Sequence, residues 1–454
     1  MNILLISTYE LGRQPFGLAS PAAWLRRSGA QVSSLDLSVQ ALDEGQVRRA
    51  DLVAFYLPMH TATRIALHVL EQVKALNPAA HLCAYGLYAP LNAELLRRRG
   101  VRTILGGEFE EGLVNLVLRS REAAAAAMQE EPIISLRKQR FLVPDRSGLP
   151  ALSAYAHLKA ADGRHRTTGY TEASRGCKHL CRHCPVVPVY GGQFRIVQPQ
   201  VVLEDIRRQV TMGAEHISFG DPDFFNGPKH ALSLVRALHR EHPDLTYDVT
   251  IKVEHLLKSI EQLEVLRDTG CAFVTTAVES VDDRVLTLLD KGHTRSDFIE
   301  VAARFRRVGL VLHPTFVAFT PWLTLASYED LLATVARLDL VENVAPIQLA
   351  MRLLIPAGSR LLELPEVREL VGPFDQETLI YRWHHPDHRI DALQREVESV
   401  VEIASETEAD RQTIFFEVWE CLQRAMGRKA ASLPPVPAGR ARATVPYLSE
   451  PWYC

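Results

Sequence analysis

The chain has 454 residues, of which 47% are hydrophobic and 23% charged, and its formal net charge is −3. This composition indicates several globular domains, and the near-neutral charge gives no electrostatic basis for binding nucleic acid or an anionic membrane. No apolar run has the length of a membrane span, and the N-terminal MNILLISTYELG lacks the marks of a signal peptide. Seven cysteines, an odd number and mostly clustered, argue against a secreted disulfide framework and predict a cytoplasmic protein.

Residues 1–120 alternate apolar runs with helical patterns, which predicts an open parallel, Rossmann-like sheet. The predicted strands are NILLIS (2–7), QVSSLDL (31–37), DLVAFYLP (51–58), HLCAYGL (81–87) and RTILGG (102–107). A ligand of such a sheet would lie beyond the carboxyl ends of the strands. The loops there are predicted over 7–21, 58–63, 86–90 and 106–110. No GxGxxG motif points to a dinucleotide.

A linker is predicted over 121–167, where an alanine-rich segment is followed by the turn-rich FLVPDRSGLPALSAY. A second alternating series over 168–358 predicts a partial (β/α)6 barrel, with its chemistry at the carboxyl ends of the strands. Its strands are predicted over 168–174, 215–220, 245–253, 271–279, 310–319 and 345–354. A C-terminal helical region (359–433) and a flexible, cysteine-containing tail (434–454) follow.

Three cysteines, Cys177, Cys181 and Cys184, follow the first predicted barrel strand with C-x3-C-x2-C spacing. Closely spaced thiolates hold iron–sulfur clusters, whereas structural zinc takes four ligands, often from two separate pairs. No second cysteine pair is present in the chain, and the nearest alternative fourth ligands are His179 and His183. A zinc site and a closed structural cluster are the alternatives.

The same spacing at the end of a first barrel strand resembles the signature of the radical S-adenosylmethionine (SAM) enzymes. The resemblance implies that the three cysteines bind a [4Fe-4S] cluster whose fourth iron is left for the amino and carboxylate groups of SAM. Reductive cleavage of SAM, with an electron from an external donor, would start a radical reaction such as methyl or other group transfer. The sequence does not identify the small-molecule or peptide substrate. The alternative function is a non-catalytic metal- or cobalamin-binding protein.

The segment SFGDPDFFN (218–226) is similar to the glycine-rich stretch of that family that binds the amino group of SAM. The resemblance implies cofactor-binding roles for Gly220, Asp221, Pro222 and Asp223. Taken alone, the same residues predict a turn with an aspartate helix cap.

Later segments resemble the remaining strand ends of the family's barrel. AVESVDDRVLTLLDKGHT (277–294) is similar to the fourth-strand segment near the ribose of SAM, which implies roles for Glu279 and Ser280. QLAMRLLIPAGS (348–359) is similar to the sixth-strand segment near the substrate. There Arg352 would offer a bidentate fork to a carboxylate, or form a structural ion pair at the barrel rim.

Residues 1–120, with GGEFE at 106–110, resemble the cobalamin-binding domain of the cobalamin-type radical SAM subclass. The histidine motif DxHxxG of many such domains is missing, and STYELGRQPFG, with Gly12, stands in its place. We therefore expect that any bound cobalamin has no protein histidine on cobalt. His60, in the predicted loop after YLP, is the alternative ligand.

The whole chain, from LLISTYELGRQPFGLASPAAWLR to EPWYC, resembles the CUAEP/CCAEP-tail group of radical SAM proteins. In that group the tail continues with selenocysteine or cysteine and then Ala-Glu-Pro. The resemblance implies that the protein encoded by the natural gene extends beyond Cys454, with a UGA codon translated as selenocysteine. It also makes this tail thiol a candidate catalytic group in a soft-metal or redox step. The alternative is an oxidisable terminal thiol without a further role.

Overall fold

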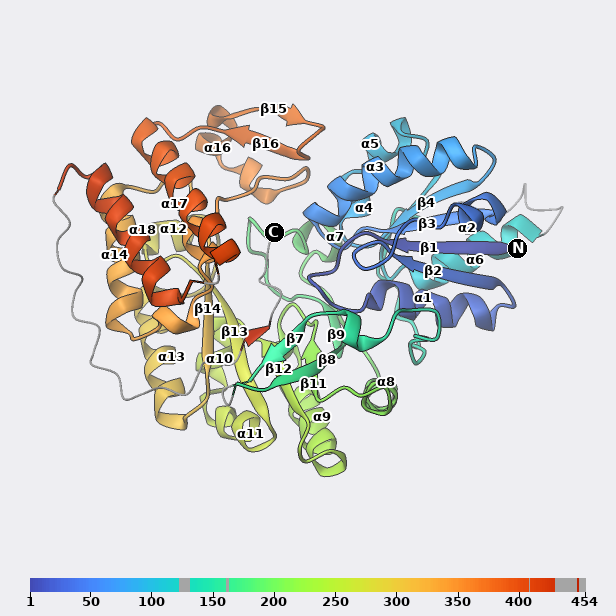
Figure 1. Ribbon diagram of the computed structural model, residues 1–454, viewed down its shortest axis with the longest axis horizontal. Helices are drawn as coiled ribbons and strands as arrows, with labels where there is room; N and C mark the ends of the chain where they lie inside the picture. Colours follow the sequence, from blue (N-terminus) through green and yellow to red (C-terminus); the bar gives the residue numbers. More distant parts are fainter. Residues whose placement is uncertain (122–130, 161–162, 408, 429–446, 449–454) are drawn as a thin grey trace.

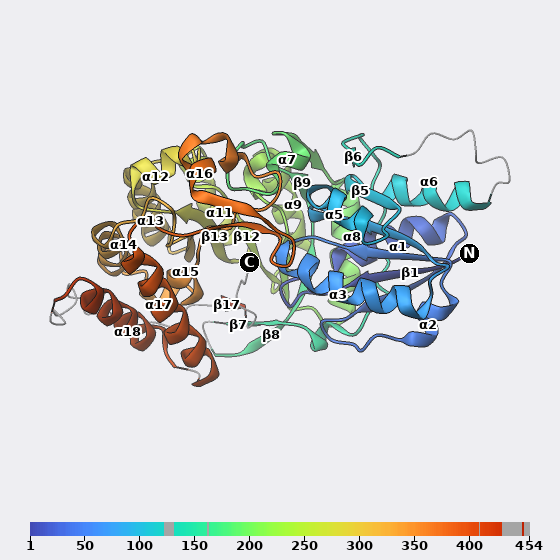
Figure 2. The same cartoon turned by 90° about the horizontal axis from the view of Figure 1, so that it is seen from above.

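The computed structural model describes residues 1–121, 131–160, 163–407, 409–428 and 447–448. Its N-terminal sheet lies beside a curled second sheet, and helices cover both (Figures 1 and 2). Within the described ranges, every helix is too short or too polar to cross a membrane. The predicted tail thiol, Cys454, lies outside these ranges.

The N-terminal sheet has six parallel strands in the order β2-β1-β3-β4-β5-β6. The strands are β1 (Asn2–Ser7), β2 (Gln31–Asp36), β3 (Leu52–Tyr56), β4 (His81–Tyr85), β5 (Thr103–Gly107) and β6 (Ile134–Ser135). One face is covered by α1 (Phe16–Arg27) and α6 (Glu110–Arg121). The other is covered by α2 (Glu44–Arg49), α3 (His60–Leu76), α4 (Tyr88–Leu91) and α5 (Ala93–Arg98). This confirms the predicted open parallel sheet. The prediction was possible because strands that are buried on both faces consist of nearly continuous apolar residues.

The loop after β1 is shorter than predicted, because α1 begins at Phe16 and includes Pro21. Pro21 has no N–H to donate to the carbonyl of Gly17, and the Tyr85 hydroxyl donates to that carbonyl at 2.8 Å. A Cβ atom on Gly17 would lie 2.1 Å from the Tyr56 ring, so glycine lets this ring pack against the helix. Contacts from two strands thus stabilise a helix start that the local sequence disfavours.

The second sheet is a partial barrel with the strand order β14-β13-β12-β11-β8-β7-β17, as predicted in outline. Its parallel strands are β8 (His165–Thr171), β11 (His216–Phe219), β12 (Thr246–Thr250), β13 (Cys271–Glu279) and β14 (Leu312–Phe316). Two antiparallel strands extend its edge, β7 (His157–Lys159) and β17 (Tyr447–Leu448). The helices between the parallel strands are α7 (Val187–Tyr190), α8 (Pro199–Thr211), α9 (Pro228–Glu241), α10 (Val253–Lys258), α11 (Leu263–Asp268), α12 (Asp283–Leu288) and α13 (Arg295–Val308). Helix α14 (Leu325–Arg337) follows β14.

The strand predicted over 345–354 is wrong, because the short helix α15 (Ile347–Ala350) occupies its centre. A single parallel bridge between Phe319 and Arg352 remains at the sixth position. The side chain of Gln348 accepts from the backbone N–H of Phe316 at 2.9 Å. The Phe316 N–H at the end of β14 therefore has a side-chain acceptor, Gln348, in place of a carbonyl from a sixth strand.

The predicted C-terminal helical region contains α16 (Pro365–Leu370), α17 (His388–Thr407) and α18 (Arg411–Ala425), and also a hairpin of β15 (Val371–Asp375) and β16 (Ile380–Trp383). The turn of this hairpin docks on the N-terminal domain. Leu379 is 1% exposed in the same core cluster as Leu57 and Tyr88. His60 Nε2 lies 2.7 Å from the Thr378 carbonyl oxygen. His60 is thus a buried residue at the start of α3, outside the loop in which it was expected.

Parts of the predicted linker join the two sheets. β6 pairs with β5, and β7 pairs with β8. Between them, the buried guanidinium of Arg146 contacts both carboxylate oxygens of Asp205 at 2.9 Å. The same group donates to the Tyr170 carbonyl at 2.7 Å and to Gln14 at 2.8 Å. Arg146 therefore connects the loop after β1 with the first barrel strand.

We predict that Arg146→Met destabilises the protein by about 3–5 kcal/mol, because it leaves the Asp205 carboxylate buried without its cation. Urea unfolding followed by tryptophan fluorescence would measure the loss. The control is Arg207→Met, which removes an exposed pair with Glu241 and should shift the midpoint far less. Equal shifts in the two variants would contradict this assignment.

Candidate active site

The three cysteines lie on one loop at the carboxyl end of the barrel, between β9 (Ser174–Gly176) and α7 (Val187–Tyr190). We call residues 177–184 the cysteine loop. Gly176 has a φ of +74°, and a Cβ atom there would lie 2.4 Å from the Tyr190 ring. Only glycine fits this close approach between the two ends of the loop. Pairing of β9 with β10 (Phe194–Ile196) supports the base of the loop.

The cysteines of the loop are all at least partly buried. Cys181 is buried, and Cys177 and Cys184 are partly exposed. Burial and the neighbouring Cys181 thiol raise the pKa of Cys184 to about 12, and burial also raises the pKa of Cys177. Thiolates at these positions therefore need a cation beside them, and iron would supply one.

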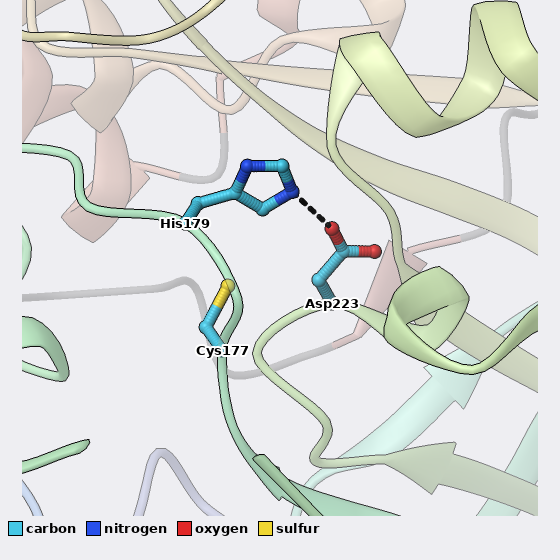
Figure 3. Close-up of side chains that lie close together, drawn as sticks. All are labelled: Cys177, His179 and Asp223. Carbon is cyan, nitrogen blue, oxygen red and sulfur yellow. Dashed lines mark ion pairs between the residues drawn. The ribbon is translucent and has the colours of Figure 1, made fainter. Parts of the chain in front are cut away.

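His179, a candidate fourth ligand, faces the barrel's carboxylates. Figure 3 shows its Nε2 pointing toward Asp223, with the Cys177 thiol to one side. Nε2 lies 3.6 Å from Asp223 Oδ2, and Nδ1 lies 3.5 Å from Glu254. His255 Nδ1 contacts the same Asp223 oxygen at 2.6 Å. Although burial opposes the effect, His179 and His255 hold the pKa of Asp223 below its usual value. The ligand atoms of Cys177, His179 and Asp223 lie within 4.8 Å of one another.

Unlike Asp223, the other three residues of the 220–223 turn do not face the cysteine loop. A Cβ atom on Gly220 would lie 1.8 Å from the Tyr170 hydroxyl, so this position requires glycine. Asp221 is buried and accepts from the Ala173 N–H at 2.9 Å and from the Ser174 hydroxyl at 2.5 Å. Burial raises the pKa of Asp221 to about 7. Pro222 is exposed. Asp221 thus braces β9, and only Asp223 of this turn faces the cysteine loop.

Glu279 ends β13 with a φ of +69°, and this strained conformation turns the chain at the rim of the barrel. Its Oε1 lies 3.2 Å from His183 Nε2 and 3.3 Å from Lys291 Nζ. Burial acts against ionisation, but Lys291 and His183 lower the pKa of Glu279 to about 2. The neighbouring Ser280 hydroxyl accepts from the Asp282 N–H at 3.1 Å. His183, like His179, is therefore directed at a carboxylate.

The family model of the Radical SAM superfamily matches residues 171–335 of the chain, from β8 to α14. These residues form a radical SAM domain. Hopanoid C-3 methylase from Methylococcus capsulatus is 24% identical over 344 residues, which cover 70% of this chain and 64% of that protein. This chain thus spans less than two thirds of the curated relative.

Two solved structures share the fold over nearly the whole chain. The cobalamin-dependent S-adenosylmethionine radical enzyme OxsB, with aqua-cobalamin bound, has a TM-score of 0.71 at 13% identity and covers 93% of this chain and 73% of its own. The radical S-adenosylmethionine methyltransferase TsrM from Kitasatospora setae, with tryptophan and a SAM analogue bound, has a TM-score of 0.66 at 15% identity. It covers 95% of this chain and 96% of its own. The arrangement of an N-terminal sheet beside a radical SAM domain is therefore an established fold.

Arg352 lies just beyond the radical SAM domain and is engaged by the C-terminal region. Its Nη1 donates to Asp391 Oδ1 and its Nη2 to the Trp383 carbonyl, both at 2.7 Å. The guanidinium also lies over the Trp383 ring, 3.6 Å from its centroid. This is the geometry of the structural ion pair, the second of the two roles that the sequence allowed.

Sequence reasoning missed several charged residues around the radical SAM domain's cysteine loop: Glu254, His255 and Lys291. Lys291 and His255 are both buried. The sequence around Lys291 is typical of a polar loop, and the sequence around His255 is typical of an ordinary helix start. The only local signal was a lysine two residues before a histidine in DKGHT, which is too common a pattern to interpret.

We predict that His179→Ala and His183→Ala each retain the iron content of the wild type after anaerobic reconstitution. The reason is that both rings are directed at carboxylates, so neither supplies a ligand. Cys181→Ala should lose the iron, and Cys83→Ala, in the N-terminal sheet, serves as the control. Loss of iron from either histidine variant would instead favour a closed cluster or a zinc site.

Proposed function

We propose that this protein is a radical SAM enzyme that cleaves SAM reductively at a [4Fe-4S] cluster. The cleavage would start a radical reaction, in the class of methyl or other group transfer, on a substrate that remains to be identified. The observation that carries the proposal is the division of roles on the cysteine loop. The Cys184 thiol interacts electrostatically with the Cys181 and Cys177 thiols, while the two histidines of the loop face Asp223 and Glu279. Among the described residues of this loop there is no fourth thiol, which leaves one iron for SAM.

A bound cluster would supply one electron to the sulfonium of SAM, which then releases methionine and a carbon radical. The chain's own contribution is to bind and orient SAM. We assign Asp223 to the ammonium group, because its pKa keeps it charged beside the cysteine loop. Glu279 is assigned to the ribose hydroxyls through Oε2, since both His183 and Lys291 contact Oε1. Lys291 keeps Glu279 ionised, and the buried surroundings strengthen each of these contacts.

The electron would come from an external one-electron donor, and the cytoplasm is the location that we propose. Six cysteines lie in the described part of the chain, and all of them are free thiols. Free thiols and an iron–sulfur cluster with an open iron both suit a reducing compartment.

We also propose cobalamin as a second cofactor, at the carboxyl edge of the N-terminal sheet. This edge faces the radical SAM domain (Figure 1), and OxsB has the same fold with aqua-cobalamin bound. The histidines of this domain do not offer a ligand there. His60 is held by the Thr378 carbonyl, His68 is exposed on α3, and His81, at the amino end of β4, bonds Thr103. We therefore infer that a cobalamin bound at this edge would have no histidine from this domain on cobalt.

The central test is SAM cleavage by the anaerobically reconstituted protein with dithionite as reductant. The wild type should release methionine, and Cys181→Ala should neither hold the cluster nor cleave SAM. Glu279→Gln should retain its iron but bind SAM about tenfold more weakly, because a charged hydrogen bond contributes about 1.5–3 kcal/mol. A normal cluster in Cys181→Ala, or unchanged affinity in both Glu279→Gln and Asp223→Asn, would refute the assignment.

The cobalamin proposal predicts that protein reconstituted with hydroxocobalamin has an absorption spectrum without protein-nitrogen coordination. His60→Ala should give the same spectrum, since this ring contacts the C-terminal hairpin. The absence of any cobalamin uptake would remove this cofactor from the mechanism, and a spectral change in His60→Ala would identify a histidine ligand.

A further inference from the structure

Two glutamates of the N-terminal domain contact the segments on both sides of the cysteine loop. Glu108 and Glu110 belong to GGEFE, which runs from the end of β5 into α6. Arg175 stands two residues before Cys177, and Tyr190 ends the short helix after the loop. GGEFE thus lies against the radical SAM domain, on both sides of the cysteine loop.

The contacts on the first side are charged and bidentate. Arg175 Nη2 lies 2.7 Å from Glu110 Oε1, and its Nη1 donates to Glu110 Oε2 at 3.0 Å. Glu108 Oε2 lies 3.4 Å from the same Nη1. Although burial opposes ionisation, Arg175 lowers the pKa of Glu110, while burial raises the pKa of Glu108 to about 7. Glu110 is therefore the principal countercharge that the N-terminal domain gives to Arg175.

The second side is held by a hydroxyl. Tyr190 OH donates to Glu108 Oε1 at 3.2 Å, and the Tyr190 ring packs against Gly176. The four side chains of Glu108, Glu110, Arg175 and Tyr190 are each 7% exposed or less. Buried charged contacts of this kind fix geometry strongly, because breaking one leaves an uncompensated charge.

We propose that Glu108 and Glu110 are positioning residues for the cluster. From the N-terminal domain they hold the segments on both sides of the cysteine loop, through Arg175 before it and Tyr190 after it. The loop would then keep the shape that three thiolates on one cluster require. The inference rests on the proposed function and extends it. The N-terminal domain becomes part of the cluster site, whatever cofactor it binds itself.

The test is the rate at which the reconstituted full-length protein loses iron to a chelator under anaerobic conditions. Glu110→Gln keeps the shape and removes the charge, and it should release iron about tenfold faster than the wild type. Tyr190→Phe removes one hydrogen bond and should accelerate release about threefold. In both variants the electron paramagnetic resonance signal of the reduced cluster should broaden, because the loop samples more than one shape.

The matched control is Asn77→Ala, at the opposite edge of the N-terminal sheet, where the Asn77 amide donates to the carbonyls of Val47 and Ala50. This variant should lower the melting temperature but leave iron release and the resonance signal unchanged. Wild-type release rates in Tyr190→Phe and in folded Glu110→Gln would overturn the proposal. So would equal acceleration in Asn77→Ala, which would indicate general instability. If the wild type itself binds no cluster, it is the proposed function that fails.

Discussion

A guanidinium buried between two domains has to be neutralised where it lies, because water cannot reach it. Arg175 meets this constraint with Glu172 from its own domain and with Glu108 and Glu110 from the N-terminal sheet. Since Arg175 stands two residues before the first cysteine of the loop, the start of that loop is tied to the junction. The radical SAM domain and the N-terminal domain therefore share one electrostatic element next to the cysteines.

The carboxylates at the strand ends divide into two groups by what they face. Asp221 accepts from the Ala173 N–H and from the Ser174 hydroxyl, so it holds the start of β9 in place. Asp223 and Glu279 instead face the histidines of the cysteine loop, one on each side. Each loop histidine thus has a carboxylate beside it, and the ligand atoms of Cys177, His179 and Asp223 also lie within 4.8 Å of one another. Under the proposed function, these two carboxylates would orient SAM beside the open iron of the cluster.

The position of the N-terminal domain is set at three places: the Arg175 cluster, the Arg146 contacts and the hairpin whose turn residue Leu379 enters its core. The first is a buried ion pair between the two domains, the second a buried arginine that bonds Gln14 of the N-terminal domain and Asp205 of the radical SAM domain, and the third is apolar. The carboxyl edge of the N-terminal sheet is thereby fixed toward the barrel (Figure 1). A ligand at that edge would lie between the sheet and the radical SAM domain.

The sequence by itself determined the two alternating series, the strands buried on both faces and the three cysteines, because apolar runs and ligand spacing are local patterns. For Arg352 the sequence allowed two roles, a fork for a substrate carboxylate or a structural ion pair, and did not distinguish them. Only the tertiary structure decided which groups meet: Lys291 with Glu279, Arg175 with Glu110, and Leu379 with the distant N-terminal core. These partners are 12, 65 and more than 250 residues apart in the chain. The pairing of side chains so far apart follows from how the elements pack, and no local period or spacing encodes it.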